Sequence, residues 1–509
     1  MSRTTITTRR QQNAARAAMP ATRKRRRRAF DAAKQTLLQS NWSTWTNPID
    51  VDLRHGLDIL RARSRSEAQN NDHAKHFLRL VKTNVIGRQG IALQGRVRTR
   101  GGKQDRRAND AIEDAWRQWG GAGSPDVTGQ WGWKDVQRSA VEAVARDGEI
   151  LVRKIAGWNG NAFRFAVQLI DPAQLDTQLN KDLGGGFRIV MGVELDAWRR
   201  PVAYHLFPDE PLSQSGHIPR GGRIRVPARE IVHCYLPEWI WQTRGVPWMS
   251  TTLKRAHNLA GYEDAEVTSS RAAAGKMGFY EQTPDAADLV LDGEDVQGNP
   301  IQEFAPGEIP VLPPGWKFAG WDPQHPNSGY DAFVKASLRG IASGLGVNYN
   351  TLANDLQGVN YTSLRHGMLT ERDVWMAIQD WFVDAFVTRI YNDWLRNALL
   401  FGQIKPATGR PFGIDREDDF RRVSWQPRRW PWVDPLKETQ ANAAAHNLRT
   451  RSLSDIIRES GRDADEVWLE IQRDNERLAE LGIASPTVVD TPAPAPTPDD
   501  GDGAAGNEG

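Results

Sequence analysis

The chain has 509 residues, of which 39% are hydrophobic and 25% charged, and a formal net charge of +3. This length allows more than one domain, and the composition is that of a globular protein. A single cysteine, Cys234, excludes an intramolecular disulfide framework and a zinc site built on paired cysteines. No apolar run approaches the roughly 20 residues that span a bilayer, and no secretory signal is recognisable.

The basic and acidic residues are concentrated at opposite ends of the chain. Residues 1–28 contain ten Lys or Arg and no acid, whereas five acids and no base follow from residue 490 onward. The body between them is nearly neutral, so it would not grip nucleic acid tightly, because tight binding needs many Lys/Arg–phosphate contacts. The basic arm is either a solvated or cleavable tail or a contact for DNA, RNA or an acidic partner, through Arg23, Lys24, Arg25, Arg26, Arg27 and Arg28.

The first half of the chain predicts helices followed by strands. Residues 1–48 are expected to be a disordered arm. Apolar residues at helical spacing then predict helices over 52–85, 105–119 and 134–146. The period changes to two in the segments that follow, which predicts strands over 149–156, 163–170, 187–195, 202–207 and 230–236. Cys234 lies in one of these apolar strands, so we expect a buried structural thiol.

The second half predicts mostly helix. A small-residue helix is expected over 249–275, a Pro/Gly-rich unit with short strands over 276–316, and a helix over 330–345. A polar loop, 347–361, precedes a helix over 363–400 that would be roughly 55 Å long. An irregular, aromatic-rich stretch, two charged helices and a disordered acidic tail complete the chain over 402–434, 435–448, 452–481 and 485–509.

No motif for catalysis is present: the chain lacks a Walker phosphate loop, HExxH and GxSxG. We therefore predict no catalytic residue, no metal and no cofactor. The acidic clusters at 263–266, 292–295 and 417–419 are expected to be solvated, the first on a helix and the others in loops. Twenty tryptophans could stack on bases, but most lie at helical apolar positions or beside proline, which favours packing and interface contacts.

Several short segments together resemble the lambda-type portal proteins of tailed bacteriophages. The match extends over about residues 50–483, and its specificity comes from the common order and spacing of the segments rather than from any one of them. They are Leu60–Ser66 with Asn70-Asn71 and Asn84–Gly87, Gly192–Asp196 with Arg200–His205, Arg244–Trp248, Tyr262–Glu266, Pro306–Ile309 with Leu312–Trp316, Asp322–Asn327, Val359–Arg365 and Trp430–Glu438.

The resemblance implies an elongated α+β subunit of a homo-dodecameric ring at one capsid vertex. Through this ring DNA would be packaged by terminase and later ejected, and head-completion or connector proteins would attach to it. The implied partners are further copies of the chain, double-stranded DNA, the terminase large subunit, the major capsid or scaffold protein and the head-completion proteins, with no membrane. The implied location is the virion, after assembly in the bacterial cytoplasm.

The resemblance also implies a division of the chain outside the arm at 1–48 and the tail at 485–509. The expected parts are an α+β wing part (49–245), a first stem helix (246–275), a clip (276–316), a second stem helix (317–346), a tunnel loop (347–361), the long helix with the wing remainder (362–434) and a helical crown (435–484).

Within the tunnel loop the amide side chains are the candidates for lining a DNA channel. Amides offer hydrogen bonds without strong attraction to phosphate, and Asp355 is the only charge in the loop, so a duplex could slide past. An ordinary surface loop is the alternative for the candidate residues Asn350, Asn354, Gln357 and Asn360. For the whole chain the rivals are a metal-dependent DNA-processing enzyme, using the basic arm and the acidic loops, and a host scaffold protein unrelated to phage.

Overall fold

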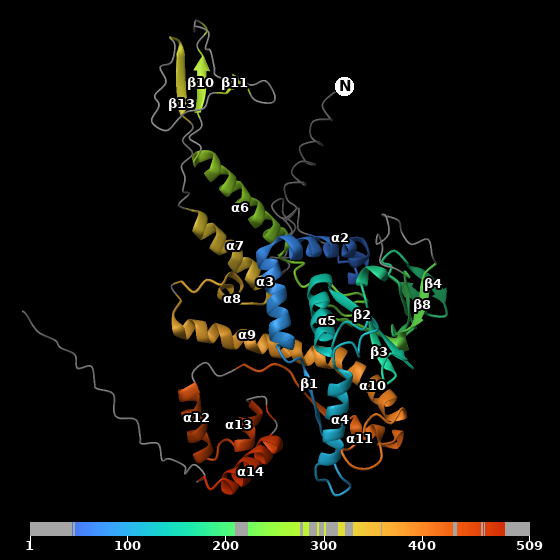
Figure 1. The fold of residues 1–509 in the computed structure, drawn as a ribbon. Coiled ribbons are helices and arrows are strands. Elements are labelled where there is room, and N and C mark those ends of the chain that lie inside the picture. The colour runs from blue at the N-terminus through green and yellow to red at the C-terminus, as the bar shows by residue number, and fades with distance from the viewer. Residues whose placement is uncertain are drawn as a thin grey trace, which may run out of the picture. The chain divides into compact units, whose positions relative to one another are not determined.

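A computed structural model describes residues 43, 46–208, 222–274, 278–282, 284, 293–294, 300–301, 314–320, 329–357, 359–430, 435–459, 462 and 464–483. The acidic tail predicted at 485–509 lies outside these residues, as does the basic arm predicted at 1–48 except for residues 43 and 46–48. The chain divides into two units, 1–48 and 49–509, and every element below belongs to the second. Helices and sheets both occur in it, which confirms the predicted α+β class (Figure 1).

The helices are α2 (Ile49–Asn70), α3 (Asp72–Val81), α4 (Arg106–Trp119), α5 (Trp133–Asp147), α6 (Leu253–Ala274), α7 (Tyr330–Leu345), α8 (Tyr349–Ala353), α9 (Tyr361–Phe382), α10 (Thr388–Leu400), α11 (Glu417–Phe420), α12 (Pro435–Asn447), α13 (Leu453–Glu459) and α14 (Ala464–Glu480). Two π-helical turns, η3 (Lys82–Ile86) and η6 (Val383–Val387), and three 3-10 turns, η4 (Pro172–Gln174), η5 (Ala228–Glu230) and η7 (Ile414–Arg416), join or flank them.

The strands form separate antiparallel sheets. A three-stranded sheet has the order β3 (Phe165–Ile170), β2 (Glu149–Ala156), β9 (Ile231–Tyr235). A five-stranded sheet has the order β4 (Lys181–Gly184), β5 (Phe187–Val190), β6 (Val193–Leu195), β7 (Pro201–Leu206), β8 (Ile224–Pro227). Two-stranded pairs join β1 (Ala92–Gly95) to β14 (Val423–Gln426), β10 (Gly278–Gln282) to β13 (Trp316–Gly320), and β11 (Gly293–Glu294) to β12 (Pro300–Ile301).

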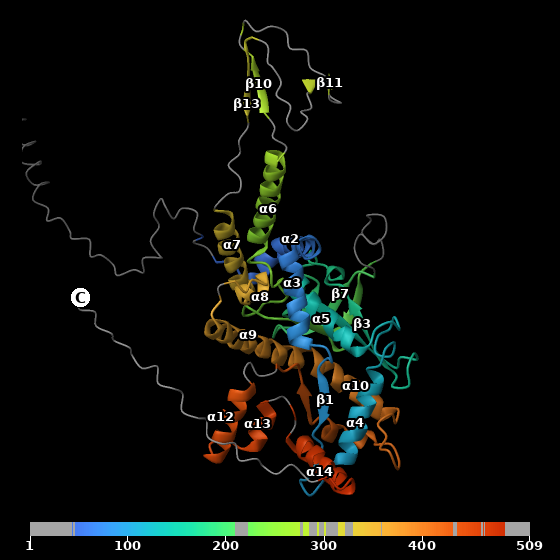
Figure 2. The ribbon, with the colours of Figure 1, turned by 60° about the vertical axis from the view of Figure 1, so that its left-hand side comes forward.

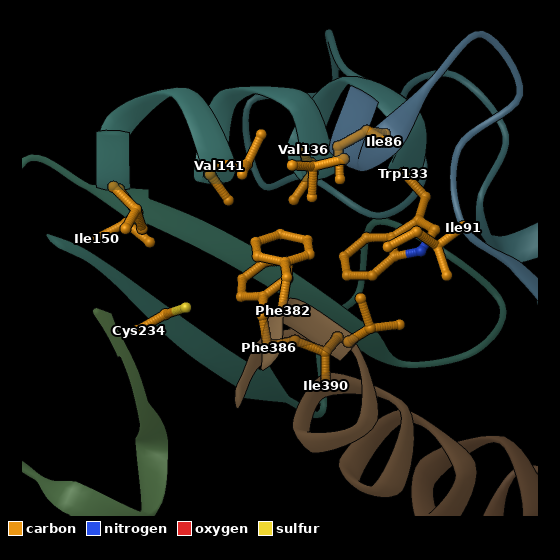
Figure 3. Packing of buried hydrophobic residues seen from close by; sticks show 14 of the residues in the cluster. Ile86, Ile91, Trp133, Val136, Val141, Ile150, Cys234, Phe382, Phe386 and Ile390 are labelled. Carbon is orange, nitrogen blue, oxygen red and sulfur yellow. The ribbon is translucent and has the colours of Figure 1, made fainter. Parts of the chain in front are cut away.

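The main core lies between α5, the three-stranded sheet and the helix that runs from α9 through η6 into α10. Val136 and Val141 of α5 face Phe382 and Phe386 across this core (Figure 3). Cys234 of β9 is buried at its edge, as predicted, and burial raises the pKa of its thiol to about 12. The thiol therefore stays protonated near neutral pH.

Aromatic rings fill the centre of this core. Trp116 contacts Trp119, Trp133 and Trp394 with ring centroids 4.8–5.4 Å apart, and Tyr391 joins them at 5.4 Å. All five side chains are buried. Packing is therefore confirmed for these tryptophans, and each contributes on the order of 3–5 kcal/mol if judged by truncation to alanine.

Several predicted elements are divided in the structure. The helix expected over 52–85 breaks at Asn71, whose side chain caps α3 by accepting from the backbone N–H groups of His73 and Ala74. The strand expected over 187–195 is wrong: β5 and β6 form a hairpin that turns at Met191 and Gly192, both with positive φ. The charged helix expected over 452–481 is two helices, α13 and α14.

Helices α6 and α7 lie side by side, and the chain passes between them through the β10–β13 pair (Figures 1 and 2). The Tyr262 ring of α6 meets the rings of Tyr330 and Phe333 of α7 at 5.9 and 4.7 Å. A side chain at Gly340 would collide with Arg255, so the absence of a Cβ lets the guanidinium of α6 approach the backbone of α7. Both helices were expected, α7 with the bounds that it has.

Candidate functional site

The segment between α7 and α9 is held by one buried carboxylate on α9. Glu371 is 8% exposed, and its Oε2 accepts hydrogen bonds from the backbone N and Nδ2 of Asn348 at 3.2 and 2.9 Å and from Oγ1 of Thr351 at 2.9 Å. Its Oε1 accepts from Nε1 of Trp375 at 3.1 Å. A carboxylate that accepts several bonds in a desolvated site fixes its donors strongly. Glu371 therefore determines where α8 and the start of the segment lie.

The only charge of the segment is engaged within it. Asp355 accepts from the backbone N of Gln357 at 2.9 Å and from the Tyr349 hydroxyl at 2.8 Å. These two bonds, the backbone one first, lower the pKa of Asp355 below its ordinary value. Burial and the hydrogen bond to Asp355 raise the pKa of Tyr349 to about 12. Both of these hydrogen bonds of Asp355 are therefore made within the segment.

The structure places the four predicted amides in different local settings. Asn350 is half-buried on α8, and the predicted loop is therefore partly helical. Asn354 ends α8 in the left-handed conformation at φ 52°. Asn360 caps α9 by accepting from the N–H of Thr362 at 3.0 Å. Gln357 is exposed, as are Asn354 and Asn360.

Two cations that sequence reasoning missed share a groove with two of these amides. Lys335 and Arg339, one helical turn apart on α7, line an open groove of about 440 Å³ together with Asn350 and Gln357. The Arg339 guanidinium lies 5.3 Å from the centre of the Tyr349 ring, where a cation–π contact stabilises it. Their spacing four residues apart was the available signal, but nothing in the sequence brings α7 against the loop.

The other predicted candidates either lie outside the described residues or form ion pairs with neighbouring side chains. Arg23, Lys24, Arg25, Arg26, Arg27 and Arg28 lie outside the described residues. The cluster 417–419 is helical and not a loop: Arg421 binds Glu417 at 2.6 Å and Arg416 binds Asp419 at 3.3 Å. In the part of the chain that the structure describes, no group of three His, Cys, Asp or Glu side chains is arranged to hold a metal ion.

A second buried site explains the Arg244–Trp248 segment. Glu149 and Arg244 are both fully buried, and Nε of Arg244 lies 2.9 and 3.0 Å from the two carboxylate oxygens. Arg61 of α2, His233 of β9 and the backbone N of Gly245 complete the shell at 2.9 Å each. The Arg244 Nη1 also donates to the carbonyl of Met191 at 2.8 Å. The cluster therefore ties α2, both larger sheets and the chain leading to α6 together.

The electrostatics of this cluster favour an ionised Glu149. Burial by itself would raise its pKa, but the charge of Arg244 and the hydrogen bond from His233 outweigh burial, so the pKa lies well below its ordinary value. Beside the cluster, a Cβ on Gly245 would collide with the carbonyl oxygen of Gly148, which itself has φ +93°. Two chain segments 97 residues apart can approach this closely only because both positions are glycine.

No helix in the described ranges is long and apolar enough to cross a membrane. Comparison with known proteins matches residues 35–379 to the family described as "Phage portal protein, lambda family". The probable portal protein of Halomonas phage phiHAP-1 is 35% identical over 464 residues, which cover 90% of this chain and 88% of the relative. Portal protein B of Escherichia phage lambda is 20% identical, covering 88% and 89%.

Among solved structures, the chain is similar to the neck of an empty gene transfer agent (GTA) particle, with a TM-score of 0.44 and 12% identity. That similarity covers 84% of this chain and 94% of the other.

Proposed function

Because the chain belongs to the lambda family of phage portal proteins, we propose that its copies close side by side into a ring, a dodecamer, around a hole that admits double-stranded DNA. The family match over residues 35–379, together with the 35% identical relative aligned over nearly its whole length, is the observation that carries the proposal. In this role the ring sits at one capsid vertex, and a separate motor, the terminase large subunit, supplies the energy. The subunit itself contributes shape and performs no catalysis.

The parts of the chain take their roles from this assignment. Residues 49–245 with 362–434 form the wing, the two helices of 246–275 and 317–346 the stem, 276–316 the clip and 435–484 the crown. The close approach of Arg255 to Gly340 and the ring contacts of Tyr262 support a paired-helix stem. The clip meets terminase and later the head-completion proteins, and the wing and crown meet capsid or scaffold protein.

Segment 347–361 lines the channel in this proposal. Its exposed amides, Asn354, Gln357 and Asn360, offer hydrogen bonds to a passing duplex. Asp355 is ionised, but the positive charges of Lys335 and Arg339 near it reduce its repulsion of phosphate. Lys335 and Arg339 border the same groove, and their two positive charges are balanced by Asp355 and by Asp331, which lies 2.9 Å from Lys335 Nζ. A site with few charges and many amides holds DNA weakly enough for it to slide.

Negative-stain electron microscopy of the purified full-length protein tests the ring directly. Rings with an axial hole support the proposal; particles that stay monomeric under assembly conditions, or that cleave DNA in the presence of divalent metal, overturn it.

The channel segment is tested by Gln357→Lys and Asn360→Lys in a packaging assay. Each lysine adds a phosphate contact, so we expect slower packaging and a stronger dependence of its rate on salt concentration. Lysine at the exposed, uncharged Ala377 of α9 adds the same single positive charge outside the segment and serves as the control. Unchanged packaging with both loop variants would remove this segment from the channel while leaving the ring proposal intact.

A further inference from the structure

Three tryptophans and an isoleucine stand in solvent at one place on the five-stranded sheet and the loop after β9. Trp198 is 82% exposed, Trp239 61%, Ile240 86% and Trp241 70%. We call these four residues the tryptophan patch. Trp198 lies in the turn between β6 and β7, and the other three lie in the loop that leads from β9 towards Arg244.

The two loops meet through a stacked pair. The Arg199 guanidinium lies 4.7 Å from the centre of the Trp241 ring, and its Nη1 donates to the Trp241 carbonyl at 3.2 Å. Arg199 and Trp241 both have left-handed backbone conformations, at φ 63° and 66°. Bulky residues rarely adopt this conformation, and where they do the surrounding structure has to hold them in it. The surrounding structure therefore holds Arg199 and Trp241 in an unfavourable backbone conformation, in which the Trp241 side chain stays exposed.

Both loops are fixed before any partner arrives. Asp196 accepts from the backbone N–H groups of Trp198 and Arg200 at 2.8 Å and from the Arg200 side chain at 2.8 Å. In the other loop, the buried Gln242 accepts from the N–H of Trp239 at 3.1 Å. Thr243 binds Asp50 of α2 through its hydroxyl at 2.8 Å. A surface that is already ordered loses little conformational entropy on binding.

The size and composition of the tryptophan patch indicate a permanent protein contact. Its four side chains expose roughly 600 Å² if a tryptophan presents about 250 Å² in full. That is most of the roughly 800 Å² that each partner buries in a standard interface, and it reaches the upper end of the largest patch on ordinary monomers. Permanent homo-oligomer interfaces are the more apolar class, and Trp and Arg are the residues that contribute most to binding energy in interfaces.

A groove lies between the tryptophan patch and the long helix that runs from α9 through η6 into α10. It has a volume of about 680 Å³, and its wall includes Trp198 and Trp241 together with Asp384 and Arg389, which both are exposed. Leu195, Tyr204 and Trp381 add apolar surface to its lining. A groove that shares Trp198 and Trp241 with the tryptophan patch can receive side chains of a partner, and Asp384 and Arg389 supply a charge of each sign for it.

We propose that the tryptophan patch and this groove are the surface on which the adjacent copy of the chain docks. The inference rests on the proposed ring, in which every subunit must offer two different faces, one to each neighbour. The opposing face belongs to a different part of the next copy, because a closed ring of more than two subunits uses heterologous contacts. The same patch is then used at every boundary between neighbouring subunits of the ring.

Site-specific crosslinking tests the proposal. Ile240 is replaced by benzoylphenylalanine in the full-length chain, and the protein is irradiated under assembly conditions. Heterologous contact joins position 240 of one copy to a different residue of the next, so each subunit can be linked on both sides and a ladder beyond the dimer is expected. Crosslinks that stop at the dimer indicate a contact of the patch with itself and overturn the proposal.

Two further outcomes separate this inference from the proposed function. Rings without crosslinks between copies, or crosslinks only to a co-expressed capsid protein, overturn the docking surface and leave the ring standing. Monomers without crosslinks overturn both.

The variant Trp239→Ser/Trp241→Ser provides an independent measurement. It should need roughly tenfold more protein to assemble, while its circular dichroism stays that of the wild type. Trp131→Ser, which removes an exposed indole (38%) from the loop before α5, is the matched control and should assemble normally. Equal assembly of the double variant and the control would also overturn the proposal.

Discussion

Replacing Glu149 by glutamine should destabilise the folded protein far more than replacing its partner Arg61 by methionine. Glutamine keeps the shape of the side chain but leaves the buried Arg244 without its carboxylate partner, and it leaves Arg61 only the longer contact to the exposed Asp58 at 3.7 Å. Removing one member of a buried ion pair costs about 3–5 kcal/mol. Both arginines are nearly inaccessible here, so we expect the upper part of that range.

Arg61→Met is the informative comparison. Burial lowers the pKa of Arg61, its Nε has no hydrogen-bond partner in the structure, and its link to Glu149 is one 2.9 Å bond. Methionine removes these costs, and Glu149 keeps Arg244, His233 and the N–H of Gly245. We expect a loss of about 1 kcal/mol or less.

Urea unfolding followed by tryptophan emission measures both variants, because the Trp116–Trp394 cluster reports on the same core. Protein concentration is held constant, since assembly shifts apparent stability. Glu149 has a lowered pKa in the folded protein, so its contribution is present above its unfolded pKa, near 4.5, and is lost as the pH falls below that value. The difference between wild type and Glu149→Gln should therefore shrink in acid. If Arg61→Met costs as much as Glu149→Gln, or the difference is constant from pH 7 to pH 3, the assignment of Glu149 as the ionised centre is incorrect.

Two further changes probe the close approach at Gly245 and the anchor of segment 347–361. Gly245→Ala should yield little soluble protein, because its Cβ would collide with the Gly148 carbonyl. Gly56→Ala on α2 is the control: a Cβ there meets nothing, so the free energy of unfolding should rise by about 0.5–1 kcal/mol. Equal yields of the two variants would disprove the close approach. Glu371→Gln replaces an acceptor oxygen by an NH₂ group that faces the donors of Asn348 and Thr351 or that of Trp375. Amide hydrogen exchange over 348–357 should therefore become faster by a factor of about 10. The exposed Asp373→Asn is the control, and an equal exchange rate in the two variants would show that Glu371 does not anchor the segment.

Helices and strands with a regular apolar period could be predicted from the sequence. The stripe on α5, the burial of Cys234 and the full extent of α7 follow from spacing alone. Trp116 and Trp394 were expected to pack because they fall on the apolar sides of α4 and α10. Local pattern is sufficient where one face of an element is buried and the other is solvated.

Contacts between distant segments could not be predicted in this way. The pairing of β1 with β14 joins residues more than 300 positions apart, and β14 itself lies in a stretch that reads as irregular. Glu149 and Arg244 look like ordinary charges until the fold brings them together, and Glu371 looks like any acid on an amphipathic helix. Positive φ at Arg199 and Trp241 has no signature in residue type, because neither is glycine.

The π-helical turn at Val383–Val387 lets the long helix bury residues both before and after the turn. A π turn holds one residue more than an α turn, and one residue corresponds to about 100° around the helix axis. The inward side before the turn, which includes Glu371 and Trp375, and the inward side after it, which includes Trp394, are therefore out of phase in an ideal helix. Deleting one residue from 383–387 would restore a regular α-helix and rotate the buried side of either α9 or α10 away from the protein interior. The extra residue therefore lets both helices keep their apolar sides buried.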